Sequence, residues 1–158
     1  MQSVTVLCVG KLKEKFYADA CAEYQKRLGR FCRLNVVELP EQRLPENPSP
    51  AEIAAALERE ADAIEEKLRG TVIALCVEGR ELSSERLADT LARFASQGAS
   101  QLTFVIGGSF GLAARIKARA ELRLSMSPMT FPHHLARVML LEQVYRAYQI
   151  QAGSKYHK

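Results

Sequence analysis

A glycine-rich segment in the second half of the chain has the composition of a ligand-binding turn. Residues 102–106 are apolar and typical of a buried strand, and Gly107-Gly108-Ser109-Phe110-Gly111 follows directly. Three glycines within five residues permit positive φ angles and close approach of a ligand to the backbone. The spacing is neither G-x-G-x-x-G nor that of a P-loop. We expect a flat or bulky ligand here, in space that a Cβ at Gly107 would fill, or else a tight turn without a ligand.

A second segment that could bind a ligand is Pro128-Met129-Thr130-Phe131-Pro132-His133-His134. Its two prolines favour an extended backbone. Such a backbone leaves N–H and C=O groups free to hydrogen-bond an adenine or a ribose. The alternative is a packed helix entry in which Met129 and Phe131 belong to the core. Neither a Ser-His-Asp pattern nor a paired-carboxylate site is present.

Basic residues are concentrated toward the C-terminus. Residues 101–158 carry eight basic and two acidic side chains, although the net charge of the chain is only +4. This bias favours a surface that faces a polyanion such as nucleic acid. Arg115, Arg119 and Arg123 would share one face if all three were helical, and could then contact phosphates. The alternative is a solvated charged stripe.

The last four residues combine side chains that suit RNA. In Lys155-Tyr156-His157-Lys158 an aromatic ring and an imidazole stand between two cations. Cations hold phosphates, and an aromatic ring can stack on an unpaired base at about 1–3 kcal/mol. The alternative is a frayed terminus. Arg146, in Tyr-Arg-Ala-Tyr, is a candidate phosphate or subunit contact.

The cysteines do not indicate a metal site. Cys8, Cys21, Cys32 and Cys76 form no C-x-x-C pair and lie far from the three histidines, whereas structural zinc needs clustered ligands. We therefore expect no metal. Cys8 and Cys76 lie in apolar runs, as buried free thiols do. Free thiols, together with no signal peptide and no membrane-length apolar run, predict a cytoplasmic protein without membrane contact.

Strand and helix patterns alternate along the chain, which predicts one α/β domain over residues 1–158 with a mostly parallel sheet flanked by helices. The expected strands are residues 3–9, 33–39, 71–77, 102–106 and 122–127. The expected helices run from Phe16 to Leu28, from a capping box at Ser49 to Gly70, from Ser83 or Ser84 to Gly98, and over residues 112–120 and 135–150. Because open parallel sheets bind ligands beyond the carboxyl ends of their strands, the loops after residues 77, 106 and 127 should form the site.

Four segments together resemble the RlmH family over essentially the whole chain. They are VGKLKEKF, FVIGGSFGL, LSMSPMTFPHHLARVMLLEQVYRAYQI and the terminal YHK. Members of this family are small SPOUT-class enzymes that methylate N3 of a pseudouridine in 23S ribosomal RNA. The resemblance implies an α/β fold whose C-terminal part forms a trefoil knot. It also implies a homodimer whose substrate is presented by the ribosome.

The resemblance further implies S-adenosylmethionine as cofactor, held by the knot loops. By matching segments, the cofactor contacts would be Leu75, Gly107, Met126, Ser127, Pro128, Met129, Thr130 and Phe131. Family members vary at Phe110, to which we assign no role. Methyl transfer would be a direct displacement in which positioning dominates and one proton leaves the acceptor base. The candidate catalytic residues are His133, Tyr156 and His157. The alternatives are a SPOUT methyltransferase acting on transfer RNA and a non-catalytic RNA-binding module.

Overall fold

The computed structural model of the protein describes residues 1–158 and contains one five-stranded sheet in which all paired strands are parallel. The order across the sheet is β2-β1-β4-β3-β5. The strands are β1 (Gln2–Val9), β2 (Cys32–Leu39), β3 (Thr71–Glu81), β4 (Gln101–Ile106) and β5 (Leu122–Ser125). The inner strands are apolar on both faces, as a parallel sheet covered by helices requires. The predicted fold class is therefore confirmed.

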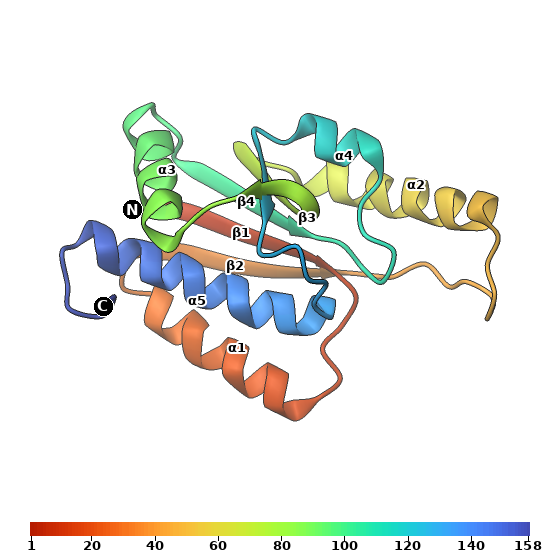
Figure 1. Ribbon diagram of the computed structural model, residues 1–158, viewed down its shortest axis with the longest axis horizontal. Coiled ribbons are helices and arrows are strands. Elements are labelled where there is room, and N and C mark those ends of the chain that lie inside the picture. The colour runs from red at the N-terminus through yellow and green to blue at the C-terminus, as the bar shows by residue number, and fades with distance from the viewer.

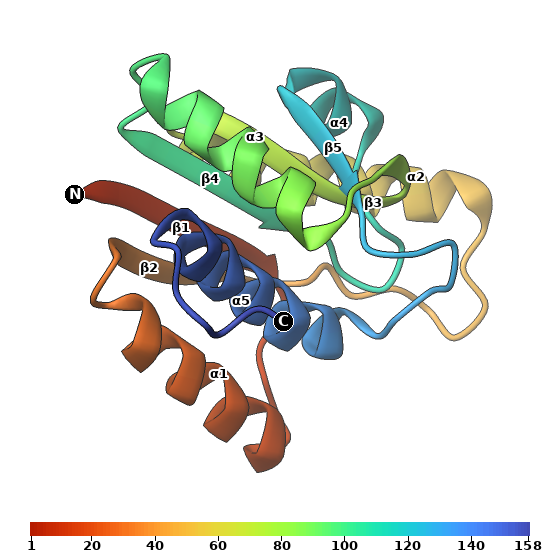
Figure 2. The same cartoon turned by 60° about the vertical axis from the view of Figure 1, so that its left-hand side comes forward.

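Five helices cover the two faces of the sheet (Figures 1 and 2). They are α1 (Lys15–Leu28), α2 (Pro50–Lys67), α3 (Ser84–Ser96), α4 (Ala114–Arg119) and α5 (His133–Gln151). One face carries α1, α5 and α3, with α5 in contact with both neighbours, and the other carries α2 and α4. None of these helices combines the length and apolar character that crossing a bilayer requires.

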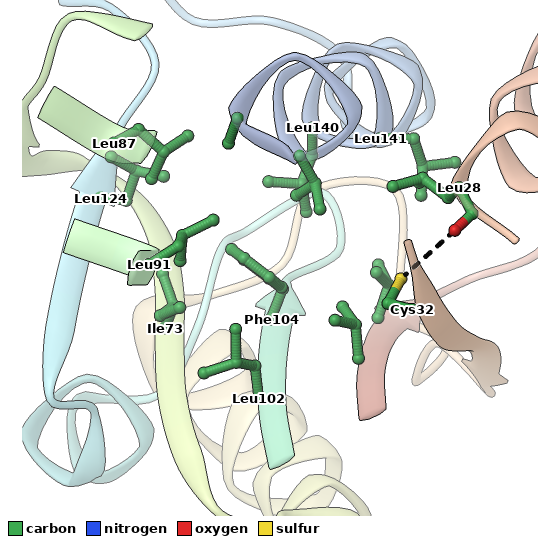
Figure 3. Packing of buried hydrophobic residues seen from close by; sticks show 14 of the residues in the cluster. Leu28, Cys32, Ile73, Leu87, Leu91, Leu102, Phe104, Leu124, Leu140 and Leu141 are labelled. Atoms are coloured by element: carbon green, nitrogen blue, oxygen red, sulfur yellow. Dashed lines mark hydrogen bonds between the residues drawn. The ribbon is translucent and has the colours of Figure 1, made fainter. Parts of the chain in front are cut away.

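The larger core lies between the sheet and the layer of α1, α3 and α5. Phe104 of β4 is fully buried there, with Leu91 of α3 and Leu140 of α5 around it (Figure 3). At the edge of this core the thiol of Cys32 donates to the carbonyl of Leu28 over 3.7 Å. A smaller core under α2 and α4 includes Ile64 and Ile116. Both cores meet the central strand β4, which fixes the carboxyl end of that strand.

Local signals set the helix starts. The hydroxyl of Ser49 accepts from the backbone N–H of Glu52, and the carboxylate of Glu52 accepts from the N–H of Ser49, so the predicted capping box is present. Such a reciprocal cap satisfies N–H groups that the first turn leaves unpaired. Ser83 caps α3 without the reciprocal bond, since its hydroxyl accepts from the backbone N–H of Arg86.

The third strand is longer and less regular than the sequence suggested. It continues to Glu81, and both Leu75 and Arg80 align with Leu124 of β5, so residues 76–79 bulge out of register. A Cβ at Gly79 would lie 2.7 Å from the carbonyl oxygen of Arg123, so only glycine allows this close approach of β3 to β5. The trefoil knot implied for this region stays a prediction.

Two other expectations about the helices need correction. The final helix begins at His133 rather than residue 135, because Pro132 precedes its first turn and fixes the entry. The spacing of four between Phe16, Ala20, Tyr24 and Leu28 predicts that they share the buried face of α1, but Phe16 does not lie on it. Its side chain is 65% exposed, and Cys21 and Leu28 are the residues of α1 that are buried.

Candidate active site

A cavity of about 730 Å³ opens at the carboxyl ends of β3, β4 and β5. Its walls come from the predicted ligand loops after β4 and β5 and, where a third loop was expected after residue 77, from the irregular part of β3 at residues 75–78. Of the predicted cofactor contacts, those on the walls are Leu75, Gly107, Met126, Ser127, Met129, Thr130 and Phe131. Pro128 does not line the cavity. The volume of the cavity falls in the range of small-molecule sites, about 300–1,000 Å³.

The glycine turn after β4 is shaped by backbone packing. Gly108 and Gly111 form an isolated bridge, and the N–H of Gly111 donates to the carbonyl of Gly108 over 3.1 Å. Of these glycines, Gly111 has a positive φ, at 82°. A Cβ at Gly107 would collide with the carbonyl group of Gly111. The expectation that this Cβ would meet the ligand is therefore corrected: it would first break the turn.

An acidic side chain from a distant loop holds the same turn. Glu41 lies in the proline-rich stretch after β2, and its carboxylate accepts from the backbone N–H of Ser109 over 3.0 Å. A Cβ at Gly108 would lie 2.7 Å from that carboxylate, so the glycine leaves room for it. The next residue of the stretch, Gln42, donates its N–H to Glu60 of α2 over 2.8 Å. The sequence analysis missed Glu41, because no spacing links it to the turn.

The last loop presents both main chain and apolar side chains. The hydroxyl of Ser125 donates to the carbonyl of Ser127, and the hydroxyl of Ser127 accepts from the N–H of Met129 over 3.0 Å. These bonds fix the bend between β5 and α5. Met129 is 72% exposed, so the interpretation that placed it in the core is wrong. Val77 and Phe110 are also exposed and, like Met129, line the cavity.

His133 lies in the first turn of α5 and lines the cavity. Its ring centroid is 4.1 Å from that of His134. Burial, followed by the charge of His134, lowers the pKa of His133 from its ordinary value, against the opposing effect of Glu41. The imidazole is therefore neutral near pH 7 and able to accept a proton.

The other two candidate catalytic residues lie elsewhere in the chain. Tyr156 donates to Glu142 over 3.2 Å, and Arg146 donates to Nδ1 of His157 over 3.0 Å. Nε2 of His157 must then carry the proton that it shares with Glu85, at 2.7 Å. We call these five residues the tail cluster. Nine residues of helix, roughly 13 Å, separate its member Glu142 from His133.

The tail cluster thus packs on α3 and α5 and not on the cavity. The guanidinium of Arg146 lies 4.9 Å from the ring centroid of Tyr156 and is hydrogen-bonded to Glu142. Burial, followed by the charge of Glu142, raises the pKa of Tyr156. Within one chain, Tyr156 and His157 therefore do not meet His133, and their catalytic role stays a prediction.

The arginine stripe predicted to contact phosphates is not available for that purpose. Arg115 pairs with Glu58, Asp62 and Glu65 of α2 at 2.6–2.9 Å. Farther along α4, Lys117 pairs with Glu78 and Arg119 with Glu121. Arg123 lies in β5 and not in a helix. The three cations of α4 are therefore paired with neighbouring acids, and Arg123, which forms no ion pair, is not on the same helical face.

Residues 2–157 of the chain match the family model described as Predicted SPOUT methyltransferase. The chain belongs to the SPOUT methyltransferase family.

Two relatives of this SPOUT methyltransferase illustrate how far the similarity extends. A protein named Ribosomal RNA large subunit methyltransferase H in Streptococcus equi subsp. zooepidemicus is 48% identical over 157 residues, covering 98% of this chain and 99% of the relative. A protein of the same name in Leuconostoc mesenteroides subsp. mesenteroides is 46% identical over 158 residues, covering 99% of each chain. The match is not confined to the glycine turn or to the tail.

Solved structures show the same fold at much lower identity. The tRNA (m1G37) methyltransferase from Aquifex aeolicus superposes with a TM-score of 0.52 at 13% identity, over 92% of this chain and 70% of its own. A methyltransferase from Legionella pneumophila, solved with bound cofactor SAM, gives a TM-score of 0.50 at 13% identity, over 93% and 66%. At this identity the similarity supports the fold of a SPOUT methyltransferase.

The cavity of this SPOUT methyltransferase has the chemistry that an adenosine-containing ligand needs. Ile106, Leu124 and Phe131 offer apolar surface, and the turns after β4 and β5 offer main-chain groups. The charged residues on its walls are Glu78 and Lys117, which pair with each other, and the titratable His133. The structure contains no cluster of three or more His, Cys, Asp or Glu that could hold a metal ion.

Proposed function

We propose that the protein is an S-adenosylmethionine-dependent methyltransferase that methylates N3 of a pseudouridine in 23S ribosomal RNA, on the ribosome. The observation that carries the proposal is the cavity at the carboxyl ends of three strands in a chain of the SPOUT methyltransferase family. The base specificity rests on the resemblance to the RlmH family, and the relatives named Ribosomal RNA large subunit methyltransferase H support it.

The cofactor would be held mainly by backbone. Gly107, Met126, Ser127 and residues 129–131 would contact it, and Leu75 would close the cavity from β3. When bound, S-adenosylmethionine supplies a methyl group already activated by a sulfonium, so no metal is required. An aromatic or apolar wall such as Phe131 suits its adenine, and the main-chain groups of the last loop suit its ribose.

His133 is the best-placed proton acceptor on the cavity wall. Because burial keeps its imidazole neutral, it can take the proton that leaves N3 of the acceptor base. The remaining catalytic contribution is positioning, since an in-line displacement needs the acceptor nitrogen held about 3–3.5 Å from the methyl group.

A homodimer would give the tail cluster access to a cavity. The tail and the cavity of one chain lie apart, and the exposed apolar residues Val77, Phe110 and Met129 line the cavity. A second copy could cover this apolar surface and bring its tail, with Tyr156 and His157, toward His133. We expect light scattering at micromolar concentration to give twice the mass of the chain. A monomeric mass would contradict the homodimer.

Nucleoside mass spectrometry tests the proposed reaction. Ribosomes from a strain that lacks the protein are incubated with the pure protein and S-adenosylmethionine, and their 23S RNA is digested. We expect 3-methylpseudouridine to appear, and to be absent with Gly107→Val protein. Transfer RNA from the same strain is the matched substrate control. Methylation of transfer RNA alone, or cofactor binding without any methylation, would refute the proposal.

A further inference from the structure

The turn between β1 and α1 lies at the end of the sheet where β1 stops (Figure 1). Because the strands are parallel, this is also the end at which the cavity opens, and the turn carries exposed cations and an exposed aromatic ring. Lys11, Lys13 and Phe16 are all exposed, and Phe16 is an exposed large apolar side chain at 65%. Lys15 pairs with Asp19, but neither Lys11 nor Lys13 forms an ion pair. We call residues 11–16 the lysine turn.

An ion pair between the buried Arg137 and the solvent-accessible Glu38 fixes the backbone of the lysine turn. Arg137 of α5 is 3% exposed, and it donates to Glu38 at the end of β2 over 2.8 Å and to the carbonyl of Gly10 over 3.2 Å. Glu38 also accepts from the N–H of Leu12 over 3.1 Å. Burial alone would raise the pKa of Glu38, but the hydrogen bonds from Arg137 and Leu12 outweigh it and hold that pKa below its ordinary value.

The same anchor sets the lysine turn beside the candidate catalytic histidine. A Cβ on Gly10 would lie 3.1 Å from Cε1 of His133, so the two residues are in contact. On the other side of the turn, Glu14 lies 3.5 Å from Nδ1 of His134. The ring centroid of Tyr17 lies 4.4 Å from that of Phe16 and 6.2 Å from that of His134, so Tyr17 connects the two. An aromatic series therefore runs from Phe16 to the cavity wall.

The unpaired state of these lysines contrasts with the basic helix α4, whose cations are neutralised by neighbouring acids. Cations that are free, exposed and held on a fixed backbone can release counterions when they meet phosphates. Exposed aromatic rings beside them provide a stacking surface for unpaired bases. Single-stranded nucleic acid is the partner that uses both features at once.

We propose that the lysine turn is the docking surface for the RNA strand that flanks the target nucleotide. Lys11 and Lys13 contact its phosphates, Phe16 stacks on an unpaired base, and the Arg137–Glu38 pair keeps these contacts beside His133. This assignment rests on the proposed function, because it presumes an RNA substrate.

The test is the kinetics of ribosome methylation by a Lys11→Gln, Lys13→Gln variant at several salt concentrations. We expect KM for ribosomes to rise about ten-fold and the slope of log KM against log salt to fall by about 1.4, as loss of two phosphate contacts to a single strand predicts. The value of kcat and the cofactor affinity measured by calorimetry should not change. Lys11→Arg, Lys13→Arg protein should behave as wild type, because the charges remain.

The matched control removes two other unpaired cations, with Lys26→Gln and Arg30→Gln near the far end of α1. This control should keep the wild-type KM and salt slope. If KM and its salt slope change as much in this control as in the lysine-turn variant, the docking surface is refuted. It is also refuted if neither quantity changes in the lysine-turn variant. Absence of methylation by wild-type protein would instead refute the proposed function.

The aromatic contact has a separate test. Phe16→Ala should lower kcat/KM for ribosomes about ten-fold, whereas Phe16→Tyr, which keeps a ring, should retain it. Light scattering is recorded on both variants. If Phe16→Ala protein loses its dimer mass along with its activity, Phe16 is a contact between copies and its RNA role is refuted. Unchanged activity in Phe16→Ala would refute it as well.

Discussion

The cavity and the tail cluster are built from different parts of the chain. The cavity walls are strand ends and turns whose positions follow from the sheet, such as the turn between Gly107 and Gly111. The tail cluster is a set of side-chain hydrogen bonds on α5 and α3, to which Tyr156 and His157 contribute from beyond the end of α5. A site made of backbone cannot be altered without disturbing the fold, whereas a site made of terminal side chains can be removed alone. The two regions should therefore respond differently to substitution.

The largest effect is expected in the glycine turn. Gly107→Val should abolish cofactor binding and lower stability, because any Cβ there collides with the carbonyl of Gly111. Gly111→Ala is the matched control, since a Cβ on Gly111 meets nothing within 4 Å and only its positive φ is strained, at about 1–2 kcal/mol. Calorimetry with S-adenosylmethionine measures both. Unchanged affinity in Gly107→Val would show that the turn does not bind the cofactor.

Deleting Tyr156, His157 and Lys158 should separate chemistry from folding. We expect methyl transfer to ribosomes to fall by roughly 100-fold, the size of a lost acid–base or orienting contribution. The melting temperature and the cofactor affinity should stay close to wild type, since the core does not include the tail. A truncated protein that methylates at the wild-type rate would remove the tail from the site and leave His133 as the remaining candidate.

The pH dependence of the rate should report His133. Its pKa is lowered from 6.5, so the neutral form persists below that pH and methyl transfer should decline only in more acidic solution. His133→Gln should slow the reaction and remove this acidic limb, while His134→Gln, which does not touch the cavity, should keep it. If the rate of His133→Gln protein still declines in acid, another titrating group causes that decline and the prediction is wrong.

The same pKa has a consequence for stability. Because the folded chain holds His133 neutral at a pH where the unfolded chain protonates it, the unfolded state binds the proton first as the pH falls. His133 therefore lowers the free energy of unfolding from about pH 6.5 downward, until the folded-state pKa is reached. Urea denaturation of wild type and His133→Gln at pH 7.5 and pH 5.5 measures this effect. We expect the free energy of unfolding of the wild type, relative to that of the variant, to be lower at pH 5.5 than at pH 7.5.

The smallest effect is expected for Glu142→Gln. The carboxylate of Glu142 accepts from both Arg146 and Tyr156. An amide at this position keeps an acceptor but loses the charge, so we expect the free energy of unfolding to fall by about 1 kcal/mol. Backbone N–H groups of residues 154–157 should exchange with solvent faster, while those of the glycine turn should not change. Faster exchange in both regions would mean that the two are coupled.

The sequence predicted the features that depend on local pattern. The strand of residues 102–106 is apolar on both faces, Ser49 and Glu52 form the capping box, and the ligand loops follow the strand ends, which is why the sheet and the cavity walls lie where expected. The order of the strands was not available from periodicity, and the trefoil knot, which the resemblance implies, stays a prediction. Periodicity describes single elements and not how they cross.

What the sequence missed depends on contacts between distant elements. The stripe that includes Arg115 has the spacing of a phosphate surface, but the acids that neutralise it lie on α2 and cannot be assigned from spacing. Phe16 fits the same helical stripe as Leu28, yet only Leu28 is buried, and Cys21, which is outside the stripe, is buried as well. Glu41 has no local signal at all, because its role depends on a turn 68 residues away.

That long-range contact of Glu41 also determines which ligands the glycine turn would reject. Free N–H groups at the end of a strand usually attract phosphate, but here a carboxylate already accepts from Ser109 and adds a negative charge beside the turn. A nucleotide would meet electrostatic repulsion and a donor that is already used. A nucleoside that carries a positive sulfonium instead of phosphates would meet neither. The cavity can thus discriminate against ATP, which shares its adenosine with S-adenosylmethionine, through one side chain that need not touch the adenosine.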